Sequence, residues 1–110
     1  MANYPADLDD VFTALADPTR RSVIRRLGRS PTTVGDLARH FPMTLPSFMK
    51  HVRTLESSGL IHTVKQGRVR TCVLNHDRLA IVDDWLATER RTWTDRTDRL
   101  ERFVTKETHP

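Results

Sequence analysis

The chain has 110 residues, 37% of them hydrophobic, and a net charge of +4, which fits one globular domain with a modest core. No apolar run reaches the roughly 20 residues that a membrane-spanning helix needs, and the acidic start, residues 1–10, lacks the basic and apolar regions of a signal peptide. The single cysteine, Cys72, excludes an internal disulfide and a structural zinc site built on thiolates. We therefore expect a cytoplasmic protein with no membrane partner.

Positive charge is concentrated in the middle of the chain. Residues 18–70 hold 11 basic and 2 acidic residues, a net charge of +9, whereas the remainder holds 7 basic and 12 acidic residues, a net charge of −5. A basic centre between acidic ends predicts a middle that binds a polyanion and flanking segments with another task. An ordinary solvated charged surface is the alternative interpretation.

Residues 7–30 are predicted to form two helices. Apolar residues recur at helical spacing from Leu8 to Leu15. Asp17 and Pro18 then supply an N-cap and a first-turn proline for a second helix, which ends near Gly28.

Residues 33–58 are predicted to form a helix-turn-helix. Thr33 opens a short third helix, and the turn over residues 41–43 leads to a fourth helix, for which Thr44 suits the N-cap. Phe48, Val52 and Leu55 share one face of that fourth helix. The opposite face carries two cations, three hydroxyls and no acid: Pro46, Ser47, Lys50, Arg53, Thr54 and Ser57. A helix of this kind fits a DNA major groove.

The rest of the chain predicts a hairpin over residues 61–74, with Gly67 at the bend, and a long helix over residues 77–104. That helix would span about 40 Å, and its apolar residues past Leu86 are spaced too far apart to bury against so small a body. We therefore predict that it dimerises. The candidate dimerisation residues are Leu8, Val11, Phe12, Leu79, Val82, Trp85, Leu86, Trp93 and Leu100.

Three helices, a turn, a fourth helix, a two-stranded hairpin and a long terminal helix make a mostly helical winged helix-turn-helix in one domain. Arginine and lysine favour guanine edges and phosphates, and serine reads either. His51 either packs behind the fourth helix or contacts a phosphate. The predicted DNA-binding residues are Thr44, Leu45, Pro46, Ser47, Lys50, His51, Arg53, Arg68 and Arg70.

The chain resembles the ArsR family of bacterial winged-helix repressors. The matching segments are residues 14–21 (ALADPTRR), 34–38 (VGDLA), 45–56 (LPSFMKHVRTLE), 58–61 (SGLI) and 66–68 (QGR). The resemblance implies a homodimer, built from the first and last helices, that represses by binding a short inverted repeat near its own promoter. Met49 stands where the family usually has a serine that contacts phosphate, and Leu45 replaces a frequent glutamine. The resemblance therefore does not supply the operator sequence.

The metal sites of the family have no counterpart in this sequence. The positions of the family's Cys-x-Cys pair are Thr33 to Gly35 here and offer no thiolate, and the last helix carries Asp83, Asp84 and Glu89 without a histidine. Acidic residues alone are weak ligands for zinc-like metals, so we expect neither a metal nor a cofactor. Cys72 is interpreted as a small inward-facing hydrophobe, with a thiol switch as the alternative.

Other functions remain as alternatives. A winged-helix adaptor could bind proteins, and a repressor could sense a metal or an oxidant through a site that the motifs do not mark. An unknown small-molecule effector would bind in an apolar groove between two protomers. No enzyme is expected, because the sequence has no Ser/His/Asp or Cys/His constellation and no phosphate-binding glycine loop.

Overall fold

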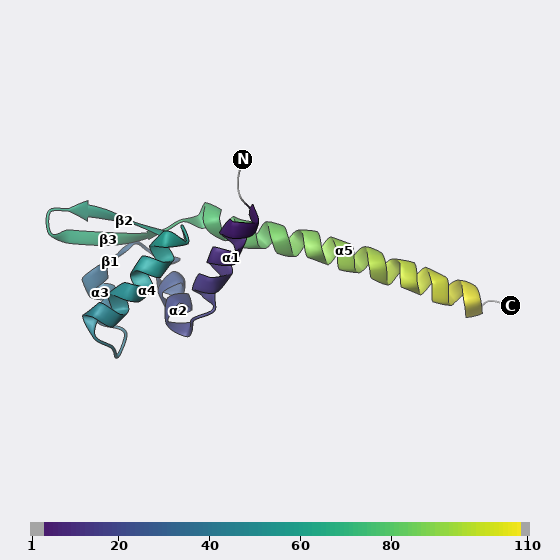
Figure 1. Cartoon of the computed structure of the whole chain (residues 1–110), viewed down its shortest axis with the longest axis horizontal. Coiled ribbons are helices and arrows are strands. Elements are labelled where there is room, and N and C mark those ends of the chain that lie inside the picture. The colour runs from purple at the N-terminus through teal and green to yellow at the C-terminus, as the bar shows by residue number, and fades with distance from the viewer. Residues whose placement is uncertain (1–3, 109–110) are drawn as a thin grey trace.

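The computed structural model describes residues 4–108. Along this part of the chain run α1 (Tyr4–Leu15), α2 (Pro18–Leu27), β1 (Thr32–Thr33), α3 (Val34–Ala38), α4 (Leu45–Ser57), β2 (Ile61–Gln66), β3 (Val69–Leu74) and α5 (His76–Thr108) (Figure 1). This order confirms the mostly helical winged fold with a long terminal helix. In the part described, no helix has the length and apolar character that crossing a bilayer requires.

Side-chain oxygens cap three of the helices at the positions that the sequence indicates. Asp17 accepts a hydrogen bond from the backbone N–H of Arg20 at 3.0 Å. Thr33 caps α3 and Thr44 caps α4 in the same way. Each cap satisfies a backbone donor that a helix would otherwise leave unpaired at its first turn, so the starts of α2, α3 and α4 are fixed locally.

The sheet has one strand more than the hairpin that the sequence predicts. β1 pairs with β3, placing Thr32 opposite Cys72, so the antiparallel strand order is β1-β3-β2. A two-residue strand leaves no period-2 pattern to detect. At the hairpin turn Gly67 has φ +62 and Arg68 a negative φ, as a type II′ turn requires.

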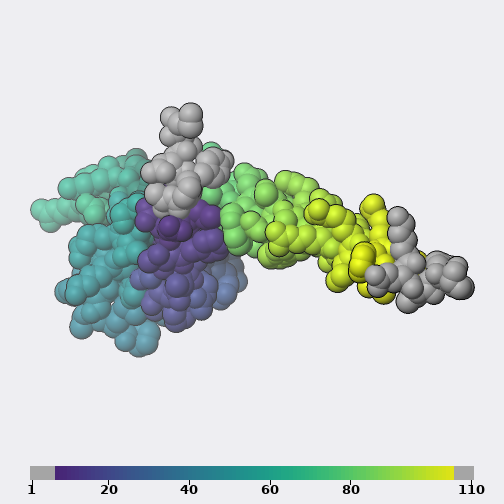
Figure 2. Space-filling model, turned by 45° about the vertical axis from the view of Figure 1, so that its right-hand side comes forward, coloured from purple at the N-terminus to yellow at the C-terminus, as the bar shows by residue number. Residues whose placement is uncertain are grey.

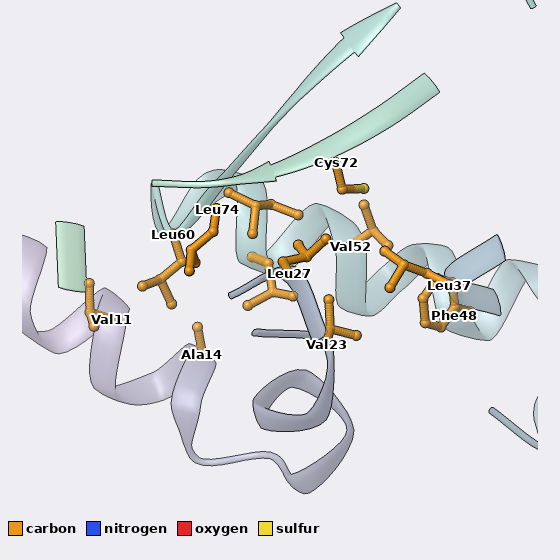
Figure 3. Close-up of a cluster of buried hydrophobic side chains, with 12 residues drawn as sticks. Val11, Ala14, Val23, Leu27, Leu37, Phe48, Val52, Leu60, Cys72 and Leu74 are labelled. Atoms are coloured by element: carbon orange, nitrogen blue, oxygen red, sulfur yellow. The ribbon is translucent and has the colours of Figure 1, made fainter. Parts of the chain in front are cut away.

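The core lies where α1 to α4 meet the base of the sheet. Phe48, Leu37, Leu55 and Leu60 are its largest fully buried side chains, and Figure 3 shows their neighbours from α1, α2 and β3 converging on the same volume. Cys72 points into this core, as the sequence predicts. Burial, followed by the charge of Glu56, raises the pKa of its thiol to about 11.

α5 leaves the body of the protein and continues alone (Figures 1 and 2). The molecule measures 76 × 35 × 22 Å, with a radius of gyration of 20.1 Å, whereas a compact chain of this length has about 13 Å. Only the first turns of α5 lie on the body. There Arg78 pairs with Asp7 of α1 at 3.2 Å, and Trp85 meets Phe12 edge to face at 5.7 Å between ring centroids.

The boundaries of two helices differ from the prediction. α1 begins at Tyr4, three residues before the predicted start at residue 7, and α5 begins at His76 and reaches Thr108, beyond the predicted 77–104. No glycine or proline breaks the sequence after His76 until the last residue, so backbone propensity continues the helix past its last apolar residue.

Candidate nucleic-acid interface

The outer face of α4 collects most of the predicted DNA-binding residues. Phe48, Val52 and Leu55 are buried and fix the rotation of the helix about its axis. The opposite side is consequently exposed. Its members include the first turn and both cations: Thr44, Leu45, Pro46, Ser47, Lys50 and Arg53.

The hydroxyl groups of this face bond to α4 itself. Thr54 donates to the carbonyl of Lys50 at 3.0 Å, and Ser57 donates to the carbonyl of Arg53 at 2.9 Å. Within the described residues Lys50 and Arg53 form no ion pair, although Glu56 lines the same shallow groove. The cations are thus the groups on this face that are available to an incoming phosphate or base edge.

His51 faces the protein rather than this outer surface. Its Nδ1 lies 3.2 Å from Nη1 of Arg20 and 3.6 Å from Oδ2 of Asp17. Arg20 in turn donates from Nε to the carbonyl of Ala14 at 2.7 Å and from Nη2 to that of Thr13 at 3.0 Å. The three side chains therefore join the end of α1, the start of α2 and the middle of α4. This geometry favours the packed interpretation of His51 over direct phosphate contact.

The Asp17 carboxylate is the acidic member of this cluster. Burial by itself would raise its pKa, but the hydrogen bond from the Arg20 backbone and the charges of His51 and Arg20 outweigh burial and lower the pKa. Asp17 therefore remains ionised in the folded protein at neutral pH, where it also caps α2.

The hairpin adds a third cation, Lys65, which is not among the predicted DNA-binding residues. Lys65 lies directly opposite Arg70 in the antiparallel register, and both are exposed, as is Arg68 at the turn. Residues 61–74 contain no acid. Like charges that face each other across two strands destabilise a sheet, so this pair indicates an anion partner. Only the register, which the sequence leaves undefined, identifies Lys65.

A groove of about 670 Å³ separates the hairpin from α3. Lys65, Arg68 and Arg70 line one wall, Thr33 to Gly35 the other, and Met49 also contributes. Met49 is partly buried and packs against the core. The residue that stands in place of the family's serine is thus a groove and core residue.

The predicted dimerisation residues differ in how far they are buried in their own chain. Val11 is completely buried in the core of its own chain, so the prediction that its side chain meets a partner is wrong for this structure. Leu8, Leu79, Val82 and Leu86 are partly buried. Phe12 and Trp85 are each 39% exposed, and farther along α5 Trp93 and Leu100 are 51% and 63% exposed.

Metal-binding side chains do not gather anywhere in the part of the chain that the structure describes: no group of three histidines, cysteines or acids is close enough to hold an ion. Asp83, Asp84 and Glu89 lie along α5, and Cys72 is buried in the core.

Comparison with known proteins agrees with this geometry. A helix-turn-helix domain family matches residues 15–64. The chain is 34% identical to the HTH-type transcriptional regulator Rv2034 of Mycobacterium tuberculosis over 89% of this chain and 78% of that protein. It is 32% identical to the transcriptional repressor SdpR of Bacillus subtilis, over 72% and 88% of the two chains.

A crystal structure of an ArsR family transcriptional regulator superimposes with a TM-score of 0.80 at 54% identity, covering 86% of this chain and 97% of that one. Fold and sequence therefore agree that the protein is a DNA-binding transcriptional regulator, and the family it matches is one of regulators rather than enzymes. The chain belongs to the ArsR family of winged helix-turn-helix regulators.

Proposed function

We propose that the protein is a homodimeric repressor that binds an inverted-repeat operator without a metal. The observation that carries this proposal is the pair Lys50 and Arg53 on the exposed face of α4, unpaired among the described residues and backed by a fully buried apolar face. α4 would lie in the major groove, with its first turn (residues 44–47) closest to the bases. The cations of the hairpin would contact the backbone beside it.

A second copy supplies the second half-site. Two-fold symmetric dimers place two recognition helices about one helical turn of DNA apart, or a multiple of it, so that the operator mirrors the symmetry of the protein. The exposed apolar residues of α5 support this assembly. An effector in an apolar groove between protomers would release the operator by changing the spacing of the two helices.

Selection of bound duplexes from a random pool, followed by gel-shift titration at fixed salt, tests the assignment. The double substitution Lys50→Ala, Arg53→Ala should weaken specific binding by roughly 100-fold or more, because each base or phosphate contact contributes about 1–3 kcal/mol. The matched control is Arg91→Ala, Arg102→Ala, which removes the same charge from exposed positions of α5 and should leave binding within a few-fold.

Equal losses in the two double variants would mean that net charge, rather than the α4 face, determines affinity. Binding to duplex DNA that is insensitive to salt would favour the adaptor function, because phosphate contacts release counterions. Stoichiometric metal in the purified protein, detected by elemental analysis, would overturn the metal-free part of the proposal.

A further inference from the structure

α5 carries a continuous seam with the spacing of a coiled coil. From Leu79 onward, residues at alternating intervals of three and four share one side of the helix, the pattern by which two helices pack along a common line. Leu79 and Val82 begin the seam and pack against the core of their own chain. Beyond Val82 the seam continues with Leu86, Glu89, Trp93, Arg96, Leu100 and Phe103. The later turns of α5 extend away from the body of the protein (Figure 1).

Large apolar side chains of the seam are exposed on α5 in a regular line. Trp93, Leu100 and Phe103 are 51%, 63% and 58% exposed, and they recur on one side along about 15 Å of helix. Scattered apolar residues on a surface are ordinary, whereas a regular line of them marks a contact site. A line with this repeat of three and four residues packs against a second helix with the same repeat. The α5 helix of a second copy of the chain is such a helix.

Two charged residues interrupt this apolar line at central positions, and they determine which arrangement is possible. In a parallel, in-register pair, Glu89 would face Glu89 of the second copy, and Arg96 would face Arg96. Like charges held together at a packed seam are unfavourable. In an antiparallel pair related by a two-fold axis beside Trp93, Glu89 of each chain instead lies level with Arg96 of the other.

We propose that Glu89 and Arg96 pair across this axis and set the orientation and register in which two copies of α5 associate. The proposal rests on the homodimer proposed above and adds its geometry. The same axis places Leu86 of one chain level with Leu100 of the other, so the apolar residues match when the charges do. Buried polar residues at seam positions are known to select register and partner in coiled coils, at a cost in stability.

Charge reversal in the full-length protein tests the pairing by analytical ultracentrifugation. Glu89→Arg and Arg96→Glu should each weaken dimerisation about tenfold or more, because each creates two like-charge contacts per dimer. The double variant Glu89→Arg, Arg96→Glu restores opposite charges and should return to within about threefold of the wild type. Glu101→Arg and Arg102→Glu, at exposed positions beside the seam, are the matched controls and should change dimerisation little.

Disulfide trapping tests the orientation independently of charge. A mixture of the Leu86→Cys and Leu100→Cys variants should form a cross-linked dimer, whereas neither variant alone should cross-link. Cys72 is buried and does not compete. Cross-linking of Leu86→Cys with itself would show a parallel pair and overturn the proposal.

Failure of this inference is distinguishable from failure of the proposed homodimer. A wild-type dimer in which the double reversal is weaker than either single reversal would overturn only the Glu89–Arg96 pairing. A wild-type chain that stays monomeric at micromolar concentration, with or without operator DNA, would overturn both.

Discussion

The guanidinium of Arg78 lies directly over Gly59 and so joins the start of α5 to the end of α4. A Cβ atom added at Gly59 would stand 2.7 Å from Nη2 of Arg78. The same arginine pairs with Asp7 of α1 at 3.2 Å. Asn75, just before α5, donates from Nδ2 to the carbonyl of Gly59 at 3.1 Å. Contacts at Gly59 therefore connect α4, which we propose binds DNA, with α5, which we propose forms the dimer.

Gly59→Ala should destabilise the protein, because it disturbs the contact between Gly59 and Arg78. Gly59 has φ +80, a conformation that costs an L-residue about 1–2 kcal/mol, and the new methyl group would also displace Arg78 from Gly59. We expect the free energy of unfolding, measured by urea denaturation, to fall by about that amount. Gly35→Ala is the control: Gly35 lies within α3 with nothing near its added Cβ, and helix propensity should raise stability by about 0.5–1 kcal/mol. A fall of equal size in both variants would contradict the explanation.

The lowered pKa of Asp17 predicts an acid-dependent loss of stability. The carboxyl of Asp17 is ionised more readily in the folded than in the unfolded protein. The ionised carboxylate therefore contributes to the stability of the fold, and this contribution is complete above the unfolded pKa of about 3.9. It is lost as the pH falls through the lower folded value. Asp17→Asn keeps an N-capping oxygen but removes the charge facing His51 and Arg20.

We expect Asp17→Asn to be less stable than the wild type at pH 7. The difference should narrow as the pH falls below about 4, which thermal unfolding at a series of pH values would reveal. A difference that is constant from pH 7 to pH 3 would show that capping or packing, not charge, is responsible.

The Cys72 thiol should be inert in the folded protein. Burial raises its pKa to about 11, and the thiolate is the reactive species. At pH 8, iodoacetamide should therefore label the native chain far more slowly than the urea-unfolded chain. The folded state favours the protonated Cys72 thiol. The stability that this thiol contributes is therefore complete below about pH 8.5 and is lost as the pH rises toward the pKa of the thiol in the folded protein. Rapid labelling of native protein would support the thiol-switch alternative.

The sequence predicts those features of the molecule that are determined locally. The caps at Asp17 and Thr44 and the buried line of Phe48 and Val52 depend only on neighbours along the chain, and the structure confirms them. Strand β1 has two residues and exists only because β3 lies beside it, so no local pattern marks it.

Contacts between distant segments could not be predicted in the same way. The burial of Val11 and the Arg78–Gly59 contact depend on how α5 is docked. His51 was ambiguous because the decisive partners, Asp17 and Arg20, lie more than 30 positions earlier in the sequence. Only the strand register, which places Lys65 opposite Arg70, identifies Lys65 as a candidate DNA-binding residue. In the sequence it is one cation among many.

Lys65 offers a test in which DNA affinity and protein stability should change in opposite directions. Its charge opposes that of Arg70 across the hairpin, so Lys65→Ala should leave stability unchanged or raise it by up to about 0.5 kcal/mol. If the groove between hairpin and α3 holds a DNA phosphate, the same substitution should lower the slope of log affinity against log salt by about 0.9.

Gel-shift titrations at several salt concentrations, paired with urea denaturation, measure both quantities. Lys65→Arg is the matched control: it preserves both the like-charge contact and the phosphate contact, so neither quantity should change much. A merely structural lysine would give the opposite combination, with lower stability and an unchanged salt slope in Lys65→Ala. Because a destabilised protein does not lose a single phosphate contact selectively, the two readouts together separate a DNA-binding role from a folding role.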